Sequence, residues 1–141
     1  MAEWLQAFAA LWSAERRLQT VGFADTLKFL TSIPAHRKVD EADPDVRRLV
    51  KAVDVAASWV PFRGDCLHQS LALCMMLRRR SIDADFVLGV YKYPFSAHAW
   101  VECDTKVIHW RFGLTTTTGF ERITSMSILA HTARLEVARG R

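Results

Sequence analysis

Two residues, Cys66 and His98, have the types and the separation that nucleophilic chemistry in a folded chain requires. Cys66 opens an apolar-periodic run that has no breaker until Ser81, so it is predicted to start a helix. His98 follows 32 residues later, inside a segment, 97–103, that is predicted to be a strand. A thiol at a helix start and an imidazole on a strand are the parts of a cysteine nucleophile and its base. The pair makes the chain a candidate hydrolase or acyl-transfer enzyme.

The predicted position of Cys66 favours a reactive thiol. An unperturbed cysteine has a pKa of about 8.5, so it is mostly protonated at neutral pH. The first turn of a helix directs free N–H groups and the positive dipole end at the sulfur, and both favour the thiolate. Asp65 could cap this helix, although its carboxylate would oppose the thiolate. Alkylation separates the two roles, because a reactive thiolate should be alkylated with a depressed pH midpoint and an inert core cysteine should not.

Each of the two residues, taken alone, also fits a purely structural role. Cys66 could be a small buried hydrophobe, and His98, which stands between two alanines, could be a satisfied core histidine. The two-residue period of a strand places His98, Trp100 and Glu102 on one face. A thiol and an imidazole that are distant in the sequence can meet only in the folded chain, and the combination of the two favours the functional interpretation.

The remaining cysteines, histidines and aromatics are predicted to be structural. His68 is expected on the exterior of its helix, and Cys74 in the core; Cys103, His36 and His131 look incidental. A metal site needs three or four converging ligands, and the paired short spacings typical of zinc are absent from the sequence, so we expect no metal and no cofactor. The larger aromatics are expected in the core or, alternatively, as walls of a peptide groove: Trp59, Tyr91, Trp100 and Trp110.

Composition limits the function classes. The chain has 141 residues, half of them apolar, which indicates one globular domain. Its net charge of +4 fits an acidic peptide as well as nucleic acid, and no basic recognition pattern favours a nucleic-acid partner. Three cysteines, an N-terminal stretch that makes a poor signal peptide, and no run of roughly 18 apolar residues predict a cytoplasmic protein without a membrane span.

The element order predicts an α+β fold, with helices first and an antiparallel meander after them. Helices are expected at 2–19, 23–32, from Pro44 (with Asp43 as N-cap) to about 59, and 66–80. Strands are expected at 84–93, 97–103 and 106–112, with a turn at 104–105. In the tail, 115–118 and 122–124 could be strands and 125–137 a helix. The apolar stripe of the first helix is predicted to comprise Trp4, Phe8, Leu11, Trp12 and Leu18.

Four sequence blocks carry a family resemblance. They are Cys66-Leu67-x-x-Ser70-Leu71-Ala72-Leu73, Leu77-Arg78-Arg79-Arg80-x-Ile82-Asp83-Ala84, Gly89-Val90 and Pro94-Phe95-x-Ala97-His98-Ala99-Trp100-Val101-Glu102. Together they resemble the lasso-peptide biosynthesis B2 proteins, which are leader peptidases: cysteine proteases on a transglutaminase-like (papain-like) fold. The match is dense over 61–102, loose in the helical N-terminal third, and adds little beyond Phe112.

The resemblance implies a single transglutaminase-like peptidase domain over 1–141: a helical portion (1–40), a catalytic core (43–112) and a C-terminal segment (113–141). It implies that Cys66 is the nucleophile and His98 the general base and later acid, with no cofactor. Such a protein removes the leader from a ribosomally made lasso-peptide precursor. Its implied partners are the precursor leader peptide, a separate leader-binding B1 (recognition-element) protein, and the ATP-dependent lasso cyclase.

The chain departs from the family pattern at the third triad residue. The family usually places an aspartate twelve residues after the histidine, where this chain has Trp110. A two-residue turn at 104–105 would place His98 opposite Arg111 and diagonal to His109, while Glu102 lies about 13 Å along the strand. We expect an active dyad or an altered triad, its imidazole oriented by His109, a backbone carbonyl or the tail. The alternatives are a catalytically impaired peptide-binding scaffold and another transglutaminase-like acyl transferase or hydrolase.

Overall fold

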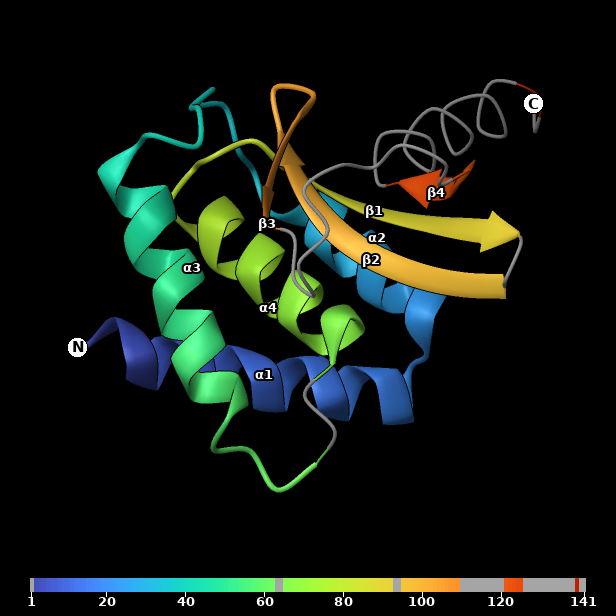
Figure 1. The fold of residues 1–141 in the computed structure, drawn as a ribbon, viewed down its shortest axis with the longest axis horizontal. Coiled ribbons are helices and arrows are strands. Elements are labelled where there is room, and N and C mark those ends of the chain that lie inside the picture. The colour runs from blue at the N-terminus through green and yellow to red at the C-terminus, as the bar shows by residue number, and fades with distance from the viewer. Residues whose placement is uncertain (1, 63–64, 93–94, 110–120, 126–138, 140–141) are drawn as a thin grey trace.

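The computed structural model describes residues 2–62, 65–92, 95–109, 121–125 and 139. Within them, helices come first and an antiparallel sheet follows (Figure 1). The helices are α1 (Glu3–Thr20), α2 (Phe23–Ser32), α3 (Pro44–Ala57) and α4 (Cys66–Arg79); the strands are β1 (Ala84–Lys92), β2 (Phe95–Cys103), β3 (Lys106–His109) and β4 (Glu121–Ser125). The predicted α+β architecture is confirmed. No helix among the described residues is long and apolar enough to cross a membrane.

Helix α4 is the centre of the packing. Every residue of α4 from Gln69 to Arg78 is buried, which agrees with an apolar stripe too broad for one face. Helices α1 and α3 pack against α4 on one side, and β1 and β2 pack against it on the other (Figure 1). The orientation of the sheet relative to its neighbours is therefore set through this one helix.

The predicted apolar stripe of α1 is only partly correct. The buried residues of α1 are Ala7, Ala10, Leu11 and Ala14. Trp4 and Trp12 are 54% and 44% exposed. The small alanine side chains form the face that meets α3 and α4, so the bulky tryptophans are left outside the contact.

Trp59 is also outside the core, against the prediction, with 77% of its surface exposed. It lines an apolar cleft of about 670 Å³ between α1 and the end of α3, together with Trp4, Leu5, Phe8, Val55 and Ala56. The alternative expectation, that some aromatics wall a groove, describes Trp59 better than a core position does.

The sheet has the strand order β3-β2-β1-β4, all antiparallel. The predicted two-residue turn is confirmed: Asp104 and Thr105 both have positive φ, 50° and 65°, as a type I′ hairpin turn requires. A bulge between Val101 and Glu102 then places His109 opposite Val101. The predicted register after the turn, which pairs Val101 with Ile108, is therefore wrong by one residue, because a bulge inserts one residue into one strand only.

The tail joins the sheet at a distant edge. The predicted strand 122–124 lies within β4, which pairs with β1 and not with its neighbours in sequence. Ser125, predicted as the first residue of a helix, is the last residue of β4. The predicted strand 115–118, residues 110–112 of the third strand and the remainder of the 125–137 helix lie outside the described residues.

Arg78 ties three elements together from inside the protein. Its guanidinium donates to the carbonyls of Leu30 (2.8 Å) and Ile33 (2.8 Å) at the end of α2, and to that of Ala84 (3.1 Å) at the start of β1. Asp83 lies 3.4 Å away as its ion partner. Arg78 is followed by two further arginines in the sequence, yet it alone of the three is buried, where it bonds to the end of α2.

We predict that Arg78→Met lowers the free energy of unfolding by about 3 kcal/mol, because two buried carbonyls, one partly buried carbonyl and one carboxylate lose their donor. Arg79→Met is the matched control, since Arg79 is the adjacent arginine and is exposed. Urea unfolding followed by circular dichroism measures both. Equal stability losses in the two variants would contradict the role given to Arg78.

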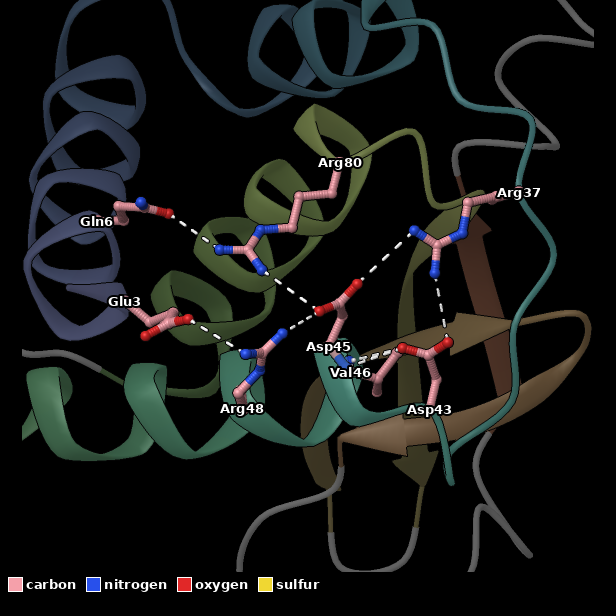
Figure 2. Close-up of polar contacts among 8 residues, drawn as sticks. All are labelled: Glu3, Gln6, Arg37, Asp43, Asp45, Val46, Arg48 and Arg80. Atoms are coloured by element: carbon pink, nitrogen blue, oxygen red, sulfur yellow. Dashed lines mark hydrogen bonds and ion pairs between the residues drawn. The ribbon is translucent and has the colours of Figure 1, made fainter. Parts of the chain in front are cut away.

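A second polar network joins α1, α3, the end of α4 and the segment that precedes α3 (Figure 2). Asp43 caps α3, as predicted, by accepting from the amides of Asp45 (2.9 Å) and Val46 (3.4 Å). Asp45 contacts Arg48, Arg37 (3.7 Å) and Arg80 (3.8 Å). The hydrogen bond from Arg48 and the charges of the three arginines lower the pKa of Asp45 below its usual value.

Because the pKa of Asp45 is lowered by folding, its carboxylate stabilises the fold above the unfolded pKa, and this stabilisation is lost as pH falls through the folded pKa. We predict that Asp45→Asn is less stable than wild type at neutral pH and that the difference shrinks on acidification. Thermal unfolding between pH 7 and pH 3 measures this. Asp25→Asn is the control, because Asp25 forms an ion pair with Lys28 in which both side chains are exposed. A difference that grows at low pH would contradict the assignment.

Candidate active site

Cys66 is the first residue of α4, as predicted. Asp65 is the N-cap: its Oδ1 accepts from the amides of Leu67 (3.2 Å) and His68 (3.4 Å). The cap uses two of the amides that a helix leaves open at its start, and the amide of Cys66 itself stays beside the sulfur. The thiol at this end of the central helix is half-buried.

The thiol of Cys66 lies against β2, where the amide of Ala99 donates a hydrogen bond to the sulfur. Burial raises the pKa of the Cys66 thiol, and the Asp65 carboxylate raises it further. The amides of Ala99, Leu67 and Cys66 act in the opposite direction but do not offset the burial. Desolvation therefore disfavours the charged form of Cys66 more than the helix terminus favours it.

His98 adjoins the contact between Cys66 and β2. It immediately precedes Ala99, the residue whose amide donates to the thiol, and its side chain is buried. Ala99, Val101 and Cys103 belong to the core that packs on the helices. His98 and Trp100, by the strand period, are on the other face, and the imidazole stacks on the indole with ring centroids 6.3 Å apart and planes 22° apart. Direct contact between the thiol and the imidazole stays a prediction.

Trp100 contacts both His98 and the carboxylate of Glu102. The indole Nε1 donates to Glu102 (2.9 Å), and the Nη2 of Arg122 lies 2.9 and 3.1 Å from the two oxygens of Glu102. Arg122 belongs to β4, so this bridge crosses β1 above Gly89. A Cβ at Gly89 would lie 2.6 Å from the indole, so the glycine leaves the space that the ring occupies. Glu102 is distant from His98 along the strand, but Trp100 fills the interval.

The prediction that His68 lies on the helix exterior is wrong. Its imidazole is held between two carboxylates. Its Nδ1 lies 3.0 Å from Asp65, its Nε2 contacts Glu15 of α1, and only 12% of its side chain is exposed. Phe62 packs on its ring, with centroids 5.4 Å apart. The prediction failed because the sequence around His68 does not show that α1 covers this side of α4. Glu15, 51 residues upstream of Cys66, is thereby linked through His68 to Asp65, the N-cap of α4.

Cys74 and Cys103 are both buried, away from the surface. Cys74 is buried and its Sγ lies 3.6 Å from the carbonyl oxygen of Ala84, and burial raises the pKa of Cys103 to about 12. The three cysteines are all free thiols. No group of three or more histidine, cysteine or acidic residues that could hold a metal occurs among the described residues. Trp110 and His131 lie outside the described residues.

Comparison with known proteins places this geometry in a family. A family model described as the transglutaminase-like superfamily matches residues 8–125. The chain belongs to the transglutaminase-like superfamily. It is also 48% identical over 48 residues to the microcin J25-processing protein McjB of Escherichia coli, an alignment that covers 34% of this chain and 23% of that protein. No solved structure matches the chain significantly. These findings confirm the transglutaminase-like fold and the family resemblance inferred from the sequence blocks.

We predict that Cys66 of the free protein is alkylated with a pH midpoint above that of an ordinary cysteine, because burial raises its pKa. Asp65→Asn should lower that midpoint, since asparagine also caps helices but carries no charge. Iodoacetamide rates as a function of pH, resolved by peptide mass spectrometry, measure this. Asp43→Asn, the equivalent change at the cap of α3, should leave the midpoint unchanged. A wild-type midpoint below that of free cysteine would contradict the prediction.

Proposed function

We propose that this transglutaminase-like protein is a cysteine peptidase that removes the leader from a ribosomally made lasso-peptide precursor. The observation that carries the proposal is the position of Cys66: a half-buried thiol at the capped start of a buried helix, in contact with the strand residue next to His98. The similarity to a microcin-processing protein over 48 residues supports the substrate class. Nucleophile, base and fold family together favour acyl chemistry on a peptide.

Because burial raises the pKa of Cys66, the thiol is protonated at rest and needs a base at the moment of attack. In the proposed mechanism His98 accepts the thiol proton as Sγ adds to the carbonyl carbon of the scissile bond. The resulting imidazolium then donates this proton to the departing amine of the mature peptide, and the leader remains as a thioester on Cys66. Water, deprotonated by His98, attacks the thioester; the leader leaves as a carboxylic acid and the thiol is restored.

The start of α4 supplies a donor for the oxyanion of both steps. The amides of Leu67 and His68 are directed to Asp65, whereas the amide of Cys66 faces the sulfur. A tetrahedral oxygen formed on the attacked carbonyl would lie within its reach. One such donor typically contributes roughly 3 kcal/mol to lowering the barrier.

The proposed chemistry needs no cofactor and implies protein partners. These are the precursor leader peptide, a separate leader-binding B1 protein and the lasso cyclase that uses the released amine, all in the cytoplasm. Nucleic acid has no part in this scheme.

Two other functions remain candidates. An acyl transferase on the same fold would use the same residues but pass the acyl group to an amine instead of water. A peptide-binding scaffold is favoured by Trp110 in place of the family's acid and by the raised pKa of Cys66. The products formed from the precursor in the presence of an added amine distinguish the peptidase, the acyl transferase and the peptide-binding scaffold.

We predict that the wild-type protein, with its leader-binding partner, cleaves the precursor at one bond, as seen by mass spectrometry. Cys66→Ala and His98→Ala should each lower kcat by at least about 10³-fold, because nucleophile and base act as a unit. Cys74→Ala removes another thiol from the same helix and should keep activity.

Each other outcome selects a different function. Cleavage by Cys66→Ala would eliminate Cys66 as the nucleophile. A folded wild type that binds the precursor without cleaving it would be a scaffold. Transfer of the leader to an added amine in preference to water would identify an acyl transferase.

A further inference from the structure

His68 occupies the junction between the start of α4 and α1. It lies two positions after Cys66, and 12% of its side chain is exposed. Its Nδ1 is 3.0 Å from Oδ1 of Asp65, the N-cap, and its Nε2 contacts Oε2 of Glu15 on α1. Because each ring nitrogen already has a carboxylate partner, His68 is placed to hold other groups in position and not to take the proton of the thiol.

One carboxylate oxygen gathers the donors at the start of α4. Oδ1 of Asp65 accepts from the amides of Leu67 (3.2 Å) and His68 (3.4 Å), and the His68 ring lies 3.0 Å from the same oxygen. Both amide contacts are longer than the usual N–H···O distance of about 2.9 Å. An ionised carboxylate only accepts, so Nδ1 is the donor to it. The imidazole therefore adds the shortest of these three contacts, and it is itself anchored on another helix.

An aromatic contact holds the same ring from another side. Phe62, in the segment that leads into α4, packs on the His68 ring with centroids 5.4 Å apart. Phe62 also meets the indole of Trp12 on α1, with centroids 5.1 Å apart and planes at 81°, an edge-to-face arrangement that aromatic pairs prefer. A polar and an aromatic connection to α1 thus meet at His68.

These contacts bear on Cys66 because they hold the turn that contains it. The amide of Gln69 donates to the carbonyl of Asp65 (3.0 Å) and closes the first turn of α4 around Cys66. The thiol of Cys66 packs against β2 at the amide of Ala99. A shift of this turn relative to α1 would move both the sulfur and the amide of Cys66 relative to β2.

We propose that His68 and Glu15 are positioning residues for Cys66: they hold the capping carboxylate of Asp65, and with it the first turn of α4, against α1. The inference rests on the proposed function for its claim that this position matters for precursor cleavage. No proton transfer to or from His68 is part of it.

The first test measures alkylation of Cys66 by iodoacetamide at pH 7 without substrate, resolved by peptide mass spectrometry. His68→Leu keeps an apolar neighbour for Phe62 but removes both ring nitrogens, and Glu15→Ala removes the anchor on α1. Burial raises the pKa of Cys66, so a loosened turn that exposes the sulfur should speed alkylation. We expect an increase of at least about threefold, which corresponds to a fall of about half a unit in the pKa of a mostly protonated thiol.

The conservative variant and the double variant test whether the two residues act as one unit. Glu15→Gln keeps an oxygen that can accept from Nε2, so it should recover most of the wild-type alkylation rate. The double variant His68→Leu/Glu15→Ala should be alkylated no faster than His68→Leu, because both changes remove the same connection to α1.

An internal reporter and two variants serve as controls. Cys74 is buried in the same helix, so its alkylation rate reports global unfolding and should stay at the wild-type value. Glu3→Ala removes another α1 glutamate, one that pairs with Arg48 of α3 (3.9 Å), and should leave Cys66 unaffected. Asp45→Asn gives the effect of lost stability alone.

The second test measures precursor cleavage by the same variants with the leader-binding partner present. His68→Leu and Glu15→Ala should lower kcat at least about tenfold with little change in KM, because displacement of an attacking group by about 1 Å can cost about 10²-fold. Glu15→Gln should recover most of this loss. Faster alkylation together with slower cleavage, at an unchanged Cys74 rate, is the signature of a misplaced nucleophile.

The outcomes separate this inference from the proposed function. Faster alkylation of Cys66 alone, in a protein whose wild type does not cleave the precursor, would support the hold on the first turn and remove the peptidase. A cleaving wild type whose His68→Leu and Glu15→Ala variants keep either the alkylation rate or kcat would overturn the positioning role alone. Slower alkylation of Cys66, or equal acceleration at Cys66 and Cys74, would also overturn it.

Discussion

The burial of α4 is the constraint on which the rest of the structure depends. Ten consecutive residues of this helix are buried, and polar side chains at both of its ends link it to the elements around it. At the C-terminal end, Arg78 points inward and ties the end of α2 to the start of β1. At the N-terminal end, Asp65, His68 and Glu15 form a chain that reaches α1. The position of Cys66 is therefore fixed by contacts at both ends of one helix.

The same burial determines the chemistry of the thiol. Packing the start of α4 against β2 brings the amide of Ala99 to Cys66, but it also removes water from the sulfur and raises its pKa. A resting thiolate is disfavoured, so an active enzyme on this scaffold must deprotonate Cys66 in step with its attack. Such a thiol is protected from unwanted alkylation and oxidation until a substrate and a base are both in place.

Three strands of the sheet contribute residues to the surroundings of His98. Strand β2 carries His98, Trp100 and Glu102. Gly89 on β1 has no side chain and leaves room for the indole of Trp100, and Arg122 on β4 forms an ion pair with Glu102. The strand order β2-β1-β4 makes the tail of the chain part of the environment of a residue in its middle.

What the sequence determined by itself was local. The bounds of the helices, the caps at Asp43 and Asp65, the turn at Asp104 and Thr105 and the shared face of His98, Trp100 and Glu102 follow from interactions within a few residues, which a sequence pattern records. Only the tertiary structure decided which tryptophans of α1 are exposed, that Glu15 reaches His68, that β4 pairs with β1, and that burial raises the pKa of Cys66. Each of these depends on which element covers which, and the free energy of burial or desolvation at one residue is set by neighbours that are distant in the chain.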